Sequence, residues 1–222
     1  GYQHMTHIKI HWIDSETVTE ENAAETLGGL DGIIVPGGFG SRGIEGMIVA
    51  ARYAREKGLP YFGICLGMQV AVIEYARHVL GLKEANSGEF DEACGHKVID
   101  FMPGQSDEID KGGTLRLGAY PCVIRGGTTM ERCYGRREIS ERHRHRYEFN
   151  NDYRADMEEA GLTLSGLSPD GTLVETVELS DRPFFVGVQY HPEFKSRPNK
   201  PHPLFLGFVG AALARAQKEQ QP

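Results

Sequence analysis

The stretch Tyr61-Phe62-Gly63-Ile64-Cys65-Leu66-Gly67-Met68-Gln69 decides what fold to expect. A short apolar run ends at a cysteine that has a glycine two positions away on each side, and a helical pattern follows at once. This is the thiol form of the G-x-S-x-G nucleophile elbow, in which a strand turns sharply into a helix and glycines prevent side-chain collisions. We expect a strained backbone at Cys65, an exposed thiol, and a helix N-terminus that favours the thiolate. The alternative is a buried cysteine in a tight turn.

The composition is that of a globular domain. The 222 residues are enough for one domain with its own core, and the net charge of −7 argues against a general nucleic-acid binder. Four cysteines without a C-x-x-C pair indicate a reducing, cytosolic setting rather than a disulfide scaffold. Cys94-Gly95-His96 has no second pair at zinc spacing, so we expect no metal site. No apolar run reaches the roughly 20 residues that cross a bilayer, and we expect no membrane contact.

Two strand–loop–helix units occupy the first third of the chain. A strand at 30–35 leads through the glycine-rich stretch 36–43 into a helix at 44–57, and a strand at 60–64 leads through Cys65 into a helix that ends near residue 80. This order predicts an α/β fold with a mostly parallel central sheet and flanking helices. Ligands bind such folds at the carboxyl ends of the strands, where both glycine-rich turns lie.

The rest of the chain has weaker patterns. A hairpin is expected around Ser168-Pro169-Asp170-Gly171, because a turn sequence separates two apolar runs there. The further expectations are strands at 8–13, 98–101, 114–125, 139–149, 162–167, 173–179 and 184–190, helices at 16–27, 152–160 and 203–216, a polar loop at 83–95, and a charged connection at 104–113.

A His-Pro-Glu sequence follows the apolar strand expected at 184–190. In extended backbone, residues two apart share a face, so His191 and Glu193 would lie side by side. A histidine held by a carboxylate is an oriented general base, and with Cys65 it completes the parts of a Cys-His-Glu triad. The alternative is a surface pair on a loop.

Gly37-Gly38 is a candidate oxyanion hole. Acyl transfer through a thiolate forms a tetrahedral oxyanion, which fixed backbone N–H groups stabilise, and those of Gly38 and Leu66 are the candidates. The competing interpretation is a phosphate-binding loop, because glycine-rich turns before helices also bind anions. The stretch lacks the G-K-[ST] of a P-loop, and we expect no nucleotide site there.

The run Glu141-Arg142-His143-Arg144-His145-Arg146-Tyr147-Glu148 places its arginines on one face of a strand and His143, His145 and Tyr147 on the other. The acidic chain argues against nucleic-acid binding by this run. A bidentate grip of an arginine on a substrate carboxylate is the more economical use. The alternative is a solvated run of charges.

Together these motifs resemble the class I (triad) glutamine amidotransferases and, more narrowly, the CTP synthase family. The resemblance runs nearly end to end and rests on residues 35–43, 63–69, 112–118, 141–148 and 191–194. It implies the amidotransferase fold, with a flavodoxin-like core. It also implies that residues 1–222 form the C-terminal glutaminase domain without its first strand and helix, and that the synthetase domain is absent.

The resemblance implies roles for individual residues. Cys65 is the nucleophile, His191 the base and then the acid, Glu193 its orienter, and the Gly38 and Leu66 amides the oxyanion hole. Thr114 and Arg116 belong to a lid that responds to GTP. Glutamine is held through its α-ammonium group by Glu89 and through its α-carboxylate by Arg146, and the whole binding set is Gly38, Leu66, Gly67, Met68, Gln69, Glu89 and Arg146.

The implied reaction is hydrolysis of L-glutamine to glutamate and ammonia through a γ-glutamyl thioester. Ammonia then serves the synthetase domain, which needs ATP and Mg²⁺ to aminate UTP to CTP in pyrimidine biosynthesis. The resemblance implies no cofactor in this domain, GTP as an allosteric effector, and a cytoplasmic homotetramer for the full-length enzyme. Two alternatives stay open, another triad γ-glutamyl hydrolase and a non-catalytic regulatory domain.

Overall fold

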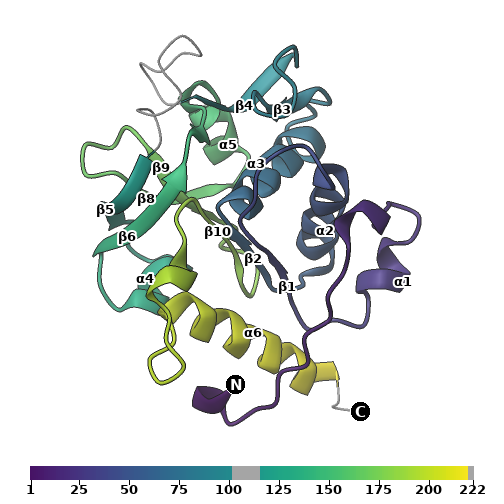
Figure 1. Ribbon diagram of the computed structural model, residues 1–222, viewed down its shortest axis with the longest axis vertical. Coiled ribbons are helices and arrows are strands. Elements are labelled where there is room, and N and C mark those ends of the chain that lie inside the picture. Colours follow the sequence, from purple (N-terminus) through teal and green to yellow (C-terminus); the bar gives the residue numbers. More distant parts are fainter. Residues whose placement is uncertain (102–115, 220–222) are drawn as a thin grey trace.

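The computed structural model describes residues 1–101 and 116–219 and arranges them around a seven-stranded sheet (Figure 1). The strand order is β1-β2-β10-β9-β8-β5-β6. These strands are β1 (Ile33–Val35), β2 (Tyr61–Ile64), β5 (Arg116–Ile124), β6 (Glu138–His145), β8 (Thr163–Leu167), β9 (Val174–Glu178) and β10 (Phe185–Val188). A small second sheet has the order β3-β4-β7, formed by β3 (Ala85–Ser87), β4 (His96–Phe101) and β7 (Tyr147–Phe149).

The α/β class with flanking helices is confirmed, but the large sheet is mixed rather than mostly parallel. Strands β1, β2 and β10 are parallel neighbours, whereas the pairs β10–β9, β9–β8, β8–β5 and β5–β6 are antiparallel. The difference comes from the connections. A helix joins β1 to β2, which permits parallel pairing, whereas the short turn at Ser168–Gly171 joins β8 to β9 and imposes an antiparallel hairpin.

Helices cover both faces of the large sheet. Helices α2 (Ile44–Lys57) and α3 (Leu66–His78) pack on one face, and α4 (Thr129–Tyr134) and α6 (Pro203–Glu219) on the other. The predicted helix at 44–57 is confirmed, since its apolar stripe is buried and Gly58 ends it in a left-handed conformation. The shorter helices are α1 (Ala23–Leu27) and α5 (Arg154–Glu159), with 3-10 turns at η1 (Tyr2–His4), η2 (Ser15–Thr17), η3 (Asn151–Tyr153) and η4 (Pro192–Lys195). Within the ranges described, no helix is both long and apolar enough to span a bilayer.

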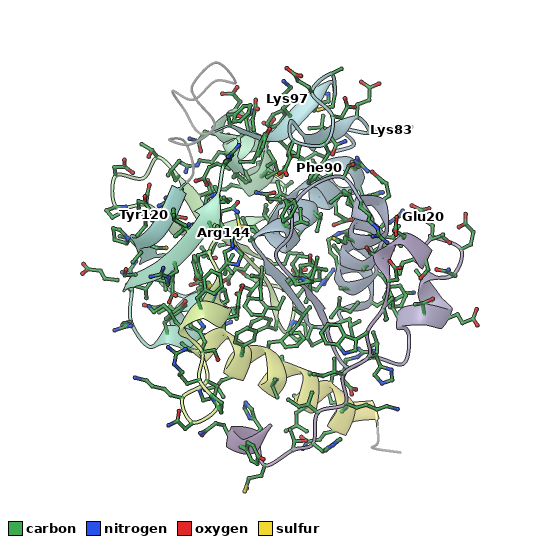
Figure 2. All side chains as sticks on the ribbon, in the orientation of Figure 1. Glu20, Lys83, Phe90, Lys97, Tyr120 and Arg144 are labelled. Carbon is green, nitrogen blue, oxygen red and sulfur yellow. The ribbon has the colours of Figure 1, made fainter. Side chains whose placement is uncertain are left out.

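The strand predicted at 139–149 is two strands that belong to different sheets. Along β6 the exposed and buried residues alternate, so Arg142 and Arg144 face outward and His143 and His145 face the interior, as the pattern predicts. Figure 2 labels Arg144 on β6 and Tyr120 on the neighbouring strand β5. The chain bends at Arg146, because β6 pairs with β5 whereas β7 pairs with β4.

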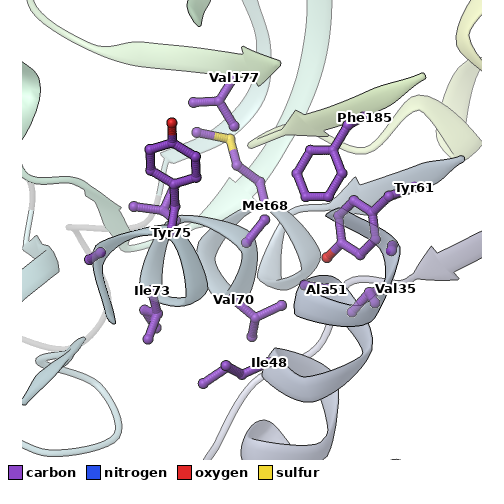
Figure 3. Close-up of a cluster of buried hydrophobic side chains, with 14 of the residues drawn as sticks. Val35, Ile48, Ala51, Tyr61, Met68, Val70, Ile73, Tyr75, Val177 and Phe185 are labelled. Atoms are coloured by element: carbon purple, nitrogen blue, oxygen red, sulfur yellow. The ribbon is translucent and has the colours of Figure 1, made fainter. Parts of the chain in front are cut away.

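The core between the sheet and α3 is built from large side chains that interlock (Figure 3). The rings of Tyr61 on β2 and Phe185 on β10 stack with their centroids 4.6 Å apart. Met68 on α3 is fully buried beside Gly187, where a Cβ would lie 3.0 Å from the Met68 side chain. The glycine therefore lets α3 approach the sheet closely, and the helix begins directly after β2, with Cys65 as its N-cap.

Two predictions near the N-terminus are wrong. Residues 6–14 form no regular element, and Ile8, Ile10 and Trp12 are exposed, because no described strand pairs with this alternating segment. The helix predicted at 16–27 is interrupted between η2 and α1. There the Thr19 N–H donates to Asn22 Oδ1 and Asn22 Nδ2 donates to the Thr17 carbonyl, so side chains replace helical hydrogen bonds.

The structure also contains elements that the sequence analysis missed. Helix α4 begins at a variant of the capping box: Thr128 Oγ1 accepts from the Glu131 N–H, and the Glu131 carboxylate accepts from the N–H of Gly127, one residue before the N-cap. This T-x-x-E signal was visible in the sequence. Strand β3 lies inside the polar loop expected at 83–95. The connection expected at 104–113 and the lid residue Thr114 lie outside the described residues.

Substitution of Gly67 by alanine tests the close approach of α3 to β1. A Cβ at Gly67 would collide with the Val35 carbonyl oxygen, whereas a Cβ at the exposed Gly29 would meet nothing within 4 Å. We expect Gly67→Ala to lower the free energy of unfolding by about 1–3 kcal/mol, as overpacking does, and Gly29→Ala to leave it nearly unchanged. Urea denaturation measures both, and equal midpoints for the two variants would contradict the close approach.

Candidate active site

Three turns from different parts of the chain meet at one edge of the sheet. Strands β1, β2 and β10 are adjacent and parallel, with Val35 opposite Gly63 and Ile64 opposite Val188. The residues that follow these strands are Gly37-Gly38 after β1, Cys65 after β2 and His191 after β10. Because the carboxyl ends of parallel strands lie at the same edge, the three predicted catalytic motifs are brought together.

Cys65 occupies a strained corner, as the elbow predicts. Its φ of 51° and ψ of −100° are unusual for a residue with a side chain, and its N–H donates to the Val188 carbonyl at 2.7 Å. A Cβ at Gly63 would lie 2.5 Å from backbone atoms of Gly67. The flanking glycines are therefore required by the turn itself.

The expectation of an exposed thiol at Cys65 is wrong. The residue is only 5% exposed, and burial raises the pKa of the thiol to about 12. The Leu66 N–H and the Gln189 side chain donate to the sulfur and lower that pKa in part. Burial outweighs these donors because a thiolate in an apolar surrounding loses its hydration. Cys65 is therefore a protonated thiol at neutral pH and needs a base.

His191 is arranged as that base. Its Nδ1 lies 2.6 Å from Glu193 Oε1, and its ring stacks on Phe194. Glu193 lies in η4 rather than in extended backbone, yet it reaches the histidine from there. His191 Nε2 is buried and has no hydrogen-bond partner among the residues that the structure describes. A proton on Nδ1, held by the carboxylate, leaves the Nε2 lone pair free to accept another.

Gly37 packs against both Cys65 and His191. A Cβ on this residue would lie 2.8 Å from His191 Cε1 and 3.6 Å from Cys65 Cβ, so only glycine leaves room for both side chains. The next residue, Gly38, lies against Leu66, because a Cβ there would be 3.0 Å from Leu66 Cδ2. The Leu66 N–H is in the first turn of α3 and has no helical acceptor. The two candidate oxyanion donors therefore lie beside Cys65.

The residues predicted to hold glutamine differ in burial: Glu89 is half-buried, whereas Gln69 and Met68 lie in the interior. Glu89 is half-buried and accepts from the Gly40 N–H at 3.1 Å, which ties it to the glycine-rich loop. Gln69 is buried, and its Nε2 donates to the Tyr147 carbonyl at 3.1 Å. That bond brings the bend at Arg146, one residue earlier, next to α3. The Met68 side chain lies in the core, so this residue can face a ligand only through its backbone.

Arg116, predicted in the lid, is buried at the start of β5. Its Nη2 lies 2.6 Å from Glu175 Oε1 and its Nη1 lies 3.4 Å from Glu148 Oε1. Burial raises the pKa of Glu148 to about 8 and lowers the pKa of nearby His145 to about 3. In this conformation the guanidinium is therefore part of the interior. Among the residues in 1–101 and 116–219, no group of three or more His, Cys, Asp or Glu could hold a metal ion.

Gln189 lies beside the thiol but belongs to none of the predicted motifs. It is fully buried, its Nε2 lies 3.6 Å from Cys65 Sγ, and its Oε1 accepts from Gln69 Nε2 at 3.2 Å. The signal in the sequence was a lone polar residue in the apolar run 184–190. Its meaning depends on the pairing of β10 with β2, which periodicity alone does not reveal.

The chain is similar to known proteins along nearly its whole length. Residues 2–211 match the family model described as glutamine amidotransferase class-I. The chain belongs to this family. The amidotransferase domain is 58% identical over 219 residues to a CTP synthase of Bacillus subtilis (strain 168), a match that covers 99% of the chain and 41% of that relative. A CTP synthase of Clostridium perfringens (strain 13 / Type A) is 60% identical over 213 residues, which are 96% of the chain and 40% of that protein.

A solved structure is also similar to the amidotransferase domain. The Trypanosoma brucei CTPS glutaminase domain with bound acivicin superposes with a TM-score of 0.91 at 41% identity, over 96% of this chain and 83% of that one. The resemblance to CTP synthase glutaminase domains is therefore confirmed. The chain spans about two-fifths of the length of the curated relatives that it matches.

The raised pKa of the Cys65 thiol predicts a slow and steadily pH-dependent alkylation. With a pKa of about 12, the thiolate at pH 8 is roughly a thousandfold rarer than for a free cysteine. We expect the rate of carboxamidomethylation of Cys65 to rise about tenfold per pH unit from pH 7 to 10. Peptide mass spectrometry after timed exposure to iodoacetamide measures this rate. A plateau below pH 9 would contradict the burial argument.

Proposed function

We propose that the domain hydrolyses L-glutamine to glutamate and ammonia, with Cys65 as nucleophile, His191 as base and acid, and Glu193 as the residue that orients His191. One observation carries the proposal. The buried Nε2 of His191 has no partner among the described residues, its Nδ1 is held by Glu193, and Gly37 packs against both this ring and the Cys65 side chain. An unsatisfied buried nitrogen costs stability, and a role as proton acceptor explains its retention.

Attack begins from the protonated thiol. His191 Nε2 takes the proton from Cys65 Sγ as the sulfur forms a bond to the side-chain carbonyl carbon of glutamine. The carbonyl π electrons move to oxygen, and the resulting oxyanion accepts hydrogen bonds from the Gly38 and Leu66 N–H groups. Glu193 stabilises the imidazolium that forms, because its carboxylate lies 2.6 Å from Nδ1.

Collapse of this intermediate releases ammonia. The carbon–nitrogen bond breaks, and His191 donates its Nε2 proton to the departing nitrogen, which leaves a γ-glutamyl thioester on Cys65. Water then attacks the thioester while His191 accepts a proton from it. The carbon–sulfur bond breaks, glutamate leaves, and the sulfur regains its proton from His191. Every proton transfer in this sequence uses the same nitrogen.

The α-substituents of glutamine need two opposite charges. A carboxylate such as Glu89 suits the α-ammonium group, and the guanidinium of Arg146 suits the α-carboxylate. Glu89 Oε1 accepts from the Gly40 N–H, which fixes the carboxylate beside the glycine-rich loop and leaves it further lone pairs for the ligand. Gly67 and Met68 complete the binding set through the backbone at the start of α3, where Gln69 fixes the neighbouring bend.

In the whole protein, we propose that the ammonia serves ATP-dependent amination of UTP to CTP on a synthetase domain outside this chain. The support is the identity of 58–60% to CTP synthases that are about 2.4 times as long. Mg²⁺ and ATP would belong to that domain, and the assembly would be a homotetramer. A GTP-responsive lid that includes Thr114 and Arg116 is part of the same proposal.

Replacement of the nucleophile tests the glutaminase function directly. Cys65→Ala should abolish ammonia release from glutamine, because no thioester can form, while the free energy of unfolding stays close to that of the parent. Cys94→Ala is the matched control, since Cys94 lies near the second sheet, and it should retain full activity. A coupled glutamate dehydrogenase assay measures the products.

Two outcomes would overturn this proposal. Ordinary glutamine hydrolysis by Cys65→Ala would remove the nucleophile from the mechanism. Hydrolysis of γ-glutamyl peptides with no activity on glutamine would instead assign the domain to another class of triad hydrolase. An electrophilic glutamine analogue that fails to label Cys65 in the parent would favour the non-catalytic alternative.

A further inference from the structure

We propose that Gln189 is a positioning residue for Cys65, because its side-chain amide holds the sulfur in place and favours the thiolate over the thiol. The expected effect on kcat rests on the proposed glutaminase function. The contact between Gln189 and the Cys65 sulfur does not depend on which substrate the domain uses. It is carried by a chain of hydrogen bonds that starts at the bend between β6 and β7 and ends at the nucleophile.

Gln189 is fixed at both ends of its side-chain amide. Gln69 Nε2 donates to the Tyr147 carbonyl at 3.1 Å and to Gln189 Oε1 at 3.2 Å. With Oε1 occupied by a donor, the Gln189 amide must present its nitrogen to Cys65 Sγ, which lies 3.6 Å away. The sulfur therefore faces a donor whose orientation is set by a second buried amide.

The backbone around Gln189 is fixed as well. The Gln189 N–H donates to the Glu175 carbonyl on β9 at 2.8 Å, and the Cys65 N–H donates to the Val188 carbonyl on β10 at 2.7 Å. Strand β10 is thus hydrogen-bonded on both sides at the level of the thiol. Since Gln189 is fully buried, its side chain has no solvent-exposed alternative.

The two donors at the sulfur, the Leu66 N–H and the Gln189 side-chain amide, have different roles during the reaction. The Leu66 N–H is also a proposed oxyanion donor, and it turns to the substrate oxygen when the tetrahedral intermediate forms. The Gln189 amide has no such second task, so it stays on the sulfur when the thioester breaks and the negative charge returns there. In a buried site, a donor aimed at a developing charge has a larger effect than it would in water.

Two substitutions of Gln189 by residues of similar size separate the effect of its N–H donor from the effect of its shape. Gln189→Met keeps the length of the side chain but has no donor, and Gln189→Glu places a second oxygen and a negative charge against the sulfur. The rate of Cys65 carboxamidomethylation by iodoacetamide at pH 9 should fall about five- to tenfold in Gln189→Met. It should fall further in Gln189→Glu, since each tenfold loss corresponds to one unit of thiol pKa.

Ser165→Ala is the matched control. It removes a buried side-chain hydrogen bond, to Thr176 Oγ1 at 2.8 Å, inside the same sheet but without contact to the thiol. This variant should alkylate at the parent rate. With glutamine as substrate, Gln189→Met should lower kcat about tenfold and leave KM within twofold of the parent value, because the amide is directed at the sulfur rather than at the substrate.

The proposal is overturned if Gln189→Met and Gln189→Glu alkylate at the parent rate, or if Ser165→Ala slows alkylation as much as they do. Should Gln189→Met fail to fold, Gln69→Met provides the test, since loss of the Gln69 donor frees the Gln189 amide to rotate. An unchanged alkylation rate in Gln69→Met would then overturn the proposal. Alkylation needs no glutamine, so these rates decide the role of Gln189 even if the domain does not hydrolyse glutamine.

Discussion

The parallel pairing of β1, β2 and β10 is the constraint on which the rest of the structure depends. The pairing aligns the ends of β1 and β2 with the end of β10, a strand that begins more than 120 residues after β2, so that the turns after all three strands meet at one edge. Glycines make the meeting possible. Gly67 lets α3 approach β1, Gly187 lets it lie on β10, and Gly37 leaves room for the thiol and the imidazole. The antiparallel half of the sheet supplies β9, which holds β10 from its other side.

Burial and reactivity oppose one another at Cys65. The same packing that fixes the sulfur raises the pKa of its thiol to about 12, so Cys65 is not a thiolate at neutral pH before the reaction begins. Two features of the site compensate for this burial. His191 provides a base whose buried Nε2 has no partner among the described residues, and the Leu66 N–H and the Gln189 side chain donate to the sulfur. The sulfur is therefore a neutral thiol at rest, and it carries negative charge only during the steps in which His191 takes up or returns its proton.

The local features of the fold could be predicted from the sequence. The apolar stripe and terminal glycine gave α2, the turn at Ser168–Gly171 gave the hairpin, and the spacing of two glycines around Cys65 gave the elbow. Features that depend on distant partners could not be predicted. The alternating segment at 8–13 lacks a strand to pair with among the described residues, and the burial of Cys65 depends on loops from three strands. The division of 139–149 between two sheets has the same origin, since nothing in its alternation marks a change of partner.

The account depends most directly on a covalent bond between Cys65 and the substrate. Isotopically labelled glutamine can be mixed with the domain, quenched in acid within milliseconds and digested, and the peptide that contains Cys65 examined by mass spectrometry. The account predicts a labelled γ-glutamyl group on Cys65 that appears before free glutamate and decays at the rate of turnover. Release of labelled glutamate with no adduct on this peptide, or an adduct on Cys94, Cys122 or Cys133 instead, would contradict it.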